Sequence, residues 1–144
     1  MPIGDPATLV RRFYSEVWDQ ADEQVARNIL HPQLSFRGSL GAERSGPDSF
    51  IDYLRQTHAA LAEYRCIIDD LIATNDRAAA RMTFTGIHRG TFFGVAATGQ
   101  RITWNGAAFF VLVDARIKNI WVLGDLDSVK QQLGATRTVP FGEA

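Results

Sequence analysis

One acidic residue near the C-terminal end, Asp125, is the first candidate for general acid/base chemistry. It follows Trp121 and Leu123 at alternating positions, so strand geometry would place the three side chains on one face. If that face lines an apolar pocket, loss of solvent favours the protonated carboxyl group, which can then exchange a proton next to a carbonyl. A structural interpretation is equally open, because Gly124-Asp125 precedes a predicted helix and aspartate is a favoured N-cap.

His88 is the second candidate for chemistry. It shares strand parity with Met82, Phe84 and Gly86, which places it on the apolar side of its strand, just before a glycine-rich turn. There it could orient a substrate carbonyl or pair with Asp125. The alternative is a hydrogen-bonded histidine with a structural role.

Aromatic side chains could hold a flat ligand beside these groups, and one amide could hold an oxygen atom. The residues predicted to bind substrate are Tyr14, Trp18, Phe36, Tyr53, Phe84, Trp104, Asn105 and Trp121. The alternative for each is a place in the hydrophobic core, where most such residues lie.

Several other function classes lack support. No pair among the three histidines and one cysteine has metal-ligand spacing, and neither a phosphate-binding glycine loop nor a Gly-x-Ser-x-Gly motif is present. The net charge is -1 and the fifteen Lys and Arg are scattered, which disfavours nucleic acid as a partner. The longest apolar stretch, 107–113, is too short to span a membrane. We expect a cytoplasmic protein without metal or cofactor that binds a small apolar or aromatic ligand.

The elements that must position these residues begin with helices. Apolar residues recur at helical spacing over 9–18, in a shorter stretch after Asp22 that stops at His31-Pro32, and again after Ser45. A short strand is expected at 33–37, and the glycine-rich region 38–46 indicates a loop.

From Tyr64 onward the apolar period becomes that of strands. We expect strands at 65–74, 77–88, 102–113 and 116–123, followed by a helix from Asp125 to Leu133 that ends at Gly134. This order predicts one α+β domain over residues 1–134, with helices on one face of a curved sheet, and a C-terminal tail over 135–144.

The segment from Thr83 to Gly99 resembles the SnoaL-like polyketide cyclase family in its order of Gly, His, Gly, Phe and Gly closed by Thr-Gly. The ending, with Trp121, Asp125 and Gln131-Gln-Leu-Gly134, is similar to that family as well. The resemblance implies a cone of the nuclear transport factor type, in which a curved antiparallel sheet wraps around helices and encloses a cavity. It also implies a homodimer through the sheet, and cofactor-free aldol cyclisation with Asp125 as the acid/base residue.

Two departures from the family bear on these expectations. Its cyclases carry a histidine on the strand before the last hairpin, whereas Gly106-Ala-Ala108 has none, so either His88 fills that role or the chain does not perform that cyclisation. The hairpin has Asp114-Ala115 where Asp-Gly is usual, so we expect a different turn geometry.

The sequence therefore predicts a cofactor-free lyase or isomerase acting on a small apolar carbonyl compound. One alternative is a non-catalytic binding protein on the same scaffold. Another is a ketosteroid-isomerase-like enzyme or an epoxide hydrolase, and epoxide hydrolysis would require Asp125, Asp69 or Asp70, and Arg81 to converge around one water. Strand parity, which turns Arg81 toward the same side as Thr83 and Thr85, argues against that convergence.

Overall fold

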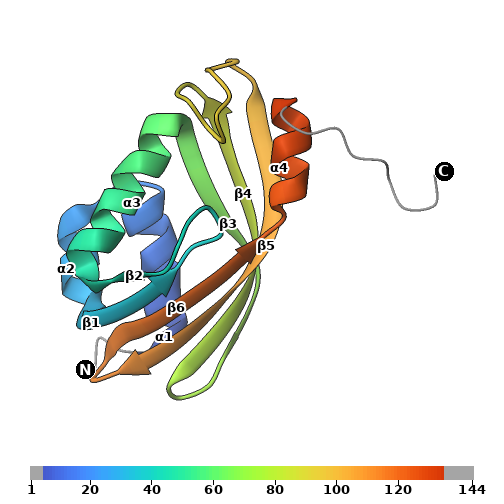
Figure 1. The fold of residues 1–144 in the computed structure, drawn as a ribbon. Helices are drawn as coiled ribbons and strands as arrows, with labels where there is room; N and C mark the ends of the chain where they lie inside the picture. Colours follow the sequence, from blue (N-terminus) through green and yellow to red (C-terminus); the bar gives the residue numbers. More distant parts are fainter. Residues whose placement is uncertain (1–4, 135–144) are drawn as a thin grey trace.

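A computed structural model describes residues 5–134, and it confirms the predicted α+β architecture. Figure 1 shows one curved sheet with helices packed inside its curve. The helical segments are α1 (Pro6–Arg12), which continues as the π-helix η1 (Phe13–Trp18), α2 (Glu23–Ile29), α3 (Gly46–Ala60) and α4 (Leu126–Leu133). The strands are β1 (Leu30–Arg37), β2 (Arg44–Ser45), β3 (Leu61–Ala73), β4 (Arg77–His88), β5 (Arg101–Val113) and β6 (Arg116–Gly124). The predicted tail 135–144 lies outside the described residues.

The first predicted helix forms, but its second half is wound more widely than an α-helix. The Asp19 amide donates to the Tyr14 carbonyl, five residues back, at 2.9 Å. Leu9, Phe13 and Val17 are fully buried on the side that faces the sheet. The wider turn brings Tyr14 and Trp18 into the same core. Within residues 5–134, no helix is long and apolar enough to cross a membrane.

The sheet is mixed, which corrects the expectation of an antiparallel sheet. Its strand order is β2-β1-β6-β5-β4-β3, and β1 runs parallel to β6 with Phe36 opposite Ile120. Strands β3 to β6 follow one another in the chain and pair antiparallel, whereas α3 and four strands, β2 to β5, separate β1 from β6. No hairpin therefore fixes the direction of β1.

The turn between β5 and β6 also differs from expectation. Asp114 and Ala115 both have positive φ, at 53° and 61°, as a type I′ hairpin turn requires. Alanine in place of the usual glycine therefore does not change the type of turn. The hairpin holds Ala115 in a left-handed conformation, which costs alanine more free energy than glycine.

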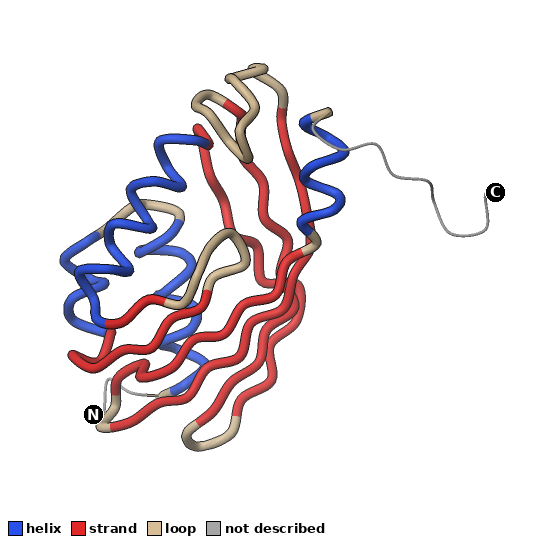
Figure 2. The backbone as a smooth tube through the Cα atoms, in the orientation of Figure 1, coloured by secondary structure: helices blue, strands red, loops and turns tan. Residues whose placement is uncertain are grey.

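Figure 2 shows α1, α2 and α3 on the inner side of the sheet, while α4 lies apart from them, beside the start of β5, where the Gln132 side chain donates to the Thr103 carbonyl. The predicted strand parity is confirmed in β4, where Met82, Phe84 and His88 are buried and Arg81 is exposed on the opposite face. Aromatic side chains from the helices and strands fill the space inside the curve. The sheet therefore has an inner face that holds the core and an outer face that α1 to α3 leave uncovered.

Candidate ligand-binding site

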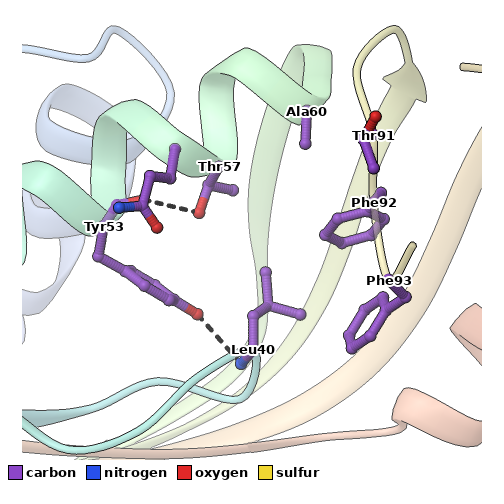
Figure 3. A pocket seen from close by; sticks show the side chains of 8 residues that line it. Leu40, Tyr53, Thr57, Ala60, Thr91, Phe92 and Phe93 are labelled. Atoms are coloured by element: carbon purple, nitrogen blue, oxygen red, sulfur yellow. Dashed lines mark hydrogen bonds between the residues drawn. The ribbon is translucent and has the colours of Figure 1, made fainter. Parts of the chain in front are cut away.

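A pocket of about 330 Å³ lies at the open end of the cone, between α3, the loop after β1 and the segment after β4 (Figure 3). We call it the mouth pocket. Its walls are mainly apolar, with one amide and several hydroxyl groups. The residues that line it are Leu40, Tyr53, Gln56, Thr57, Ala60, Thr91, Phe92 and Phe93.

Helix α3 supplies one wall because Tyr53, Thr57 and Ala60 recur at helical spacing and lie on one face. The Thr57 hydroxyl donates to the Tyr53 carbonyl at 2.9 Å, so its proton is used within the helix and its oxygen can only accept a hydrogen bond from a ligand. The wall therefore presents a tyrosine ring and small apolar groups to a ligand.

A tight turn after β4 supplies the opposite wall. The Phe92 and Val95 backbones exchange two hydrogen bonds, at 3.0 and 2.9 Å, around Phe93 and Gly94. Both central residues have positive φ, 48° for Phe93 and 75° for Gly94. The turn brings the rings of Phe92 and Phe93 to 4.8 Å between centroids, so two aromatic rings form this side of the pocket.

Deeper in the cone lies a second space of only about 20 Å³, which we call the inner chamber. It is lined by Tyr14, Trp18, Phe36, Gly38, Ser39, Tyr53, Tyr64, Phe84 and Val122. Five of the eight residues predicted to bind substrate are in this set, and Trp104 packs against Phe84 at 5.4 Å between ring centroids. The sequence thus identified the wall of the cone, but the expected large internal cavity is filled by side chains and has room for about one water-sized group.

Tyr53 lines both spaces and stands between them. Its hydroxyl accepts a hydrogen bond from the Leu40 amide at 3.1 Å (Figure 3). A β-carbon at position 38 would lie 2.6 Å from the same hydroxyl, so only glycine lets the tyrosine pack here. Burial raises the pKa of Tyr53 to about 12, so the group is a hydrogen-bond donor or acceptor at neutral pH and not a base.

His88 is fully buried, and protein groups occupy both of its ring nitrogens. Nδ1 accepts from the Thr98 amide at 3.2 Å and lies 2.9 Å from the Thr98 hydroxyl, while Nε2 lies 3.2 Å from the Val95 carbonyl. Because a carbonyl only accepts, Nε2 carries the proton. The imidazole holds the 95–98 loop in place and lines neither the mouth pocket nor the inner chamber, which favours the structural alternative for this residue.

Asp125 does not face the inside of the cone, so that expectation was wrong. The predicted parity with Trp121 and Leu123 is correct, but those two side chains are 40% and 53% exposed on the outer face of the sheet. Asp125 is exposed and caps α4, with its carboxylate accepting from the Ser128 amide at 3.1 Å. The face was misassigned because apolar residues occupy both sides of β6.

Asn105 and Trp121 are also on the outer face, which corrects their expected place in the cavity. The Asn105 side chain donates to the Thr83 hydroxyl at 3.0 Å, and the Arg37 guanidinium lies 5.4 Å from the Trp121 ring centre. The residues that epoxide hydrolysis would require are not brought together at the pocket either. Asp70 and Arg81 are opposite each other in the register of β3 and β4, and both side chains are exposed.

Sequence reasoning missed most of the mouth pocket, including Leu40, Gln56 and the Phe92-Phe93 pair. One signal was present, since the pair stands between Gly90 and Gly94 and the flanking glycines indicate a turn that presents aromatic rings. Leu40 lies in a loop, and Gln56 is exposed on α3, so no apolar period marks either of them.

Comparisons with solved structures support the same architecture. TsrD from Streptomyces laurentii is 27% identical, with a TM-score of 0.79, and the match covers 90% of this chain and 95% of TsrD. A candidate SnoaL-like polyketide cyclase from Jannaschia sp. CCS1 is 19% identical, with a TM-score of 0.82 and coverage of 91% and 92%. AclR, a candidate hydroxylase from Streptomyces galilaeus, is 23% identical, with a TM-score of 0.80 and coverage of 94% and 88%.

No curated protein matches the chain by sequence. The family model for SnoaL-like polyketide cyclases, in contrast, matches residues 8–133, which span every helix and strand described above except the first two residues of α1. The chain therefore belongs to the SnoaL-like polyketide cyclase family.

Proposed function

We propose that this protein binds a small, neutral, apolar or aromatic organic molecule in the mouth pocket. The observation that carries the proposal is the pocket itself, which has about 330 Å³ of space between the α3 wall and the rings of Phe92 and Phe93. Concave, largely apolar sites with a few polar groups are typical of small-molecule binding.

The groups around the pocket favour binding over proton transfer. Among the described residues that line the mouth pocket and the inner chamber there is no carboxylate, imidazole or thiol. The polar groups are hydroxyls, one amide side chain and backbone groups. These groups can orient a ligand by hydrogen bonds, but at neutral pH none of them is a base able to remove a proton from carbon.

A second candidate function is cofactor-free aldol cyclisation or isomerisation of a small apolar carbonyl compound, and family membership favours it. In that function Asp125 would be the acid/base residue and His88 its partner. The geometry argues against this pair, because the Asp125 carboxylate caps α4 on the outer side while His88 lies buried on the inner face of β4.

The binding proposal can be tested by blocking the mouth pocket. Gln56 is exposed and lines the pocket, so Gln56→Trp would place a large ring across the opening with little effect on the core. Asp52→Trp is the matched control, since Asp52 is exposed one turn earlier on α3 and lines neither space. We use the bicyclic compounds tetralin and α-tetralone as probes in calorimetric titrations. Gln56→Trp should weaken binding about tenfold or more, equivalent to ~1.4 kcal/mol, and Asp52→Trp should not.

We also infer a homodimer through the outer face of the sheet. Six large apolar side chains are exposed there although α1 to α3 cover only the inner face: Ile67, Ile72, Phe109, Val113, Trp121 and Leu123. The rings of Phe109 and Trp121 lie 5.9 Å apart, and large apolar side chains gathered on one exposed face are typical of an interaction site. The cytoplasmic location expected from the sequence stays a proposal; the single cysteine, Cys66, is free and buried and requires no oxidising compartment.

A further inference from the structure

The mouth pocket has room for an aromatic side chain as well as for a free ligand. The rings of Phe92 and Phe93 form one side of it, and Leu40 approaches from the loop after β1 (Figure 3). The space measures about 330 Å³. Since a cavity of about 150 Å³ holds a benzene molecule, the pocket can take a phenyl ring with a small group beside it.

Helix α4 ends beside the wall of this pocket. The Lys130 amine lies 5.6 Å from the ring centre of Phe93, which lines the pocket. In Figure 1 the C-terminal end of α4 lies near the loop between β4 and β5, to which Phe93 belongs. The Gln132 side chain holds the last turn of the helix, because it donates to the Thr103 carbonyl at 2.7 Å and accepts from the Thr103 amide at 2.9 Å. The chain therefore leaves α4 at a fixed point next to the pocket.

The segment that follows α4 in the sequence carries an aromatic side chain within reach of the pocket. Gly134, with a φ of 75°, ends the helix in a left-handed conformation. Residues 135–144 lie outside the described residues, and their large apolar side chains are gathered at Val139-Pro-Phe141. Phe141 is the seventh residue after Gly134, and seven extended residues span about 25 Å. Because one helical turn, about 5.4 Å, separates Lys130 from Gly134, this reach includes the pocket.

A contact within one chain requires only weak intrinsic affinity. A short linker gives an effective concentration in the millimolar range, so a side chain with a millimolar dissociation constant would fill the pocket about half of the time. Pro140 restricts the backbone of the segment and reduces the conformational entropy lost on binding. A ligand must then displace the segment, which lowers its apparent affinity by the fraction of molecules whose pocket is free.

We propose that Phe141, together with Pro140, occupies the mouth pocket of its own chain in the absence of ligand and leaves it when a ligand binds. The segment 135–144 is thus an intramolecular competitor of the ligand. It favours molecules that fill the pocket better than one phenyl ring does. This inference rests on the proposed function and adds to it the regulation of the same site.

The first test compares tetralin binding to the native protein and to two variants by calorimetry. Phe141→Ala removes the competing ring, so it should bind tetralin about twofold to tenfold more tightly than the native protein. Thr136→Ala is the matched control, because it shortens a side chain of the same segment outside 139–141. It should bind tetralin as the native protein does. Neither position is among the residues that line the pocket, so the walls are the same in all three proteins.

The second test detects the contact itself by NMR. In nuclear Overhauser spectra of the ligand-free protein, the ring protons of Phe141 should give cross-peaks to the methyl groups of Leu40, which lines the pocket. These cross-peaks should be absent from Phe141→Ala and should disappear from the native spectrum as tetralin is added. Dilution should not weaken them, since the contact lies within one chain.

The outcomes separate this inference from the proposed function. If the native protein and Phe141→Ala bind tetralin equally and the cross-peaks are absent, the mouth pocket is confirmed and the competing segment is overturned. Cross-peaks that weaken on dilution would show that a second copy supplies the ring, which also overturns the inference. If neither protein binds tetralin, the proposed binding function fails, and the inferred competition fails with it.

Discussion

The Tyr53 hydroxyl accepts a hydrogen bond from the Leu40 amide at 3.1 Å, and this contact ties the loop after β1 to α3 between the two spaces of the site. Tyr53→Phe removes the acceptor and leaves the ring in place. We expect it to lower the free energy of unfolding by about 1 kcal/mol. Hydrogen exchange at the Leu40 amide should become faster, since its partner is lost, and mass spectrometry would detect the change.

Tyr14→Phe is the matched control for that variant, because it makes the same chemical change at a hydroxyl without a partner in the described structure. Removing an unpaired buried hydroxyl should leave the free energy of unfolding unchanged or raise it. Denaturant titrations of the two variants would test this contrast. A loss of similar size in both would show that the Tyr14 hydroxyl has a partner in the free protein.

The alkaline stability of the protein should depend on its tyrosines. All three tyrosines of the chain are buried, and burial raises the pKa of Tyr14 and Tyr64 well above 10.0 and that of Tyr53 to about 12. The folded state therefore holds phenolic protons that the unfolded chain releases near pH 10. This contribution to stability is fully present below pH 10 and is lost as the pH rises through the folded-state values.

Ultraviolet absorbance of tyrosinate and circular dichroism, recorded on the same alkaline titration, would test this expectation. The two signals should change together, because the phenols ionise when the chain unfolds. Tyrosinate formed near pH 10 in a protein that keeps its native circular dichroism would contradict the buried positions of the three rings.

Asp125 should behave as a helix cap. Its carboxylate accepts from the Ser128 amide at 3.1 Å, so Asp125→Ala should cost about 1 kcal/mol of stability. Asp125→Asn keeps a good N-cap and should change stability by only a few tenths of a kcal/mol. Neither variant should change the affinity for α-tetralone. A large loss of affinity or activity in Asp125→Asn, with unchanged stability, would instead support the acid/base role.

The relative phase of residues along β6 could be predicted from the sequence, but the face on which they lie could not. Alternation correctly placed Asp125 in phase with Trp121 and Leu123. The error came from assuming that large apolar side chains mark the inside of the cone. In this sheet the outer face also carries them, including Phe109, so hydrophobicity alone does not distinguish the two sides.

The mouth pocket was beyond sequence reasoning for a different reason. Its walls come from α3, from Leu40 and from the turn at Phe92, and only the folded structure brings these segments together. The strand boundaries, in contrast, follow from local patterns. The prediction of 77–88 coincides with β4, because alternating burial and the Asn75-Asp76 turn both act within a few residues.

The His88 imidazole should act as a clamp on the loop that leads from the mouth pocket back to β5. His88→Leu would leave the Thr98 amide without its partner and would remove one of the two donors to the Val95 carbonyl, which keeps the Phe92 amide, at a cost of about 1–2 kcal/mol. Hydrogen exchange over residues 95–98 should become faster. Thr98→Val is the milder control, because the backbone amide of residue 98 can still donate to Nδ1.

The outer face of the sheet should hold two copies of the chain together. Phe109 is 52% exposed, and its ring lies 5.9 Å from that of Trp121, so both belong to the apolar surface. Phe109→Glu adds a charge that a dimer would have to bury, but the monomer can keep it in water. Sedimentation should therefore show a native dimer and a folded Phe109→Glu monomer. Gln20→Glu makes the same change of charge at an exposed position outside the sheet and should stay dimeric. A native protein that sediments as a monomer at all concentrations would refute the dimer and leave this apolar face for another partner.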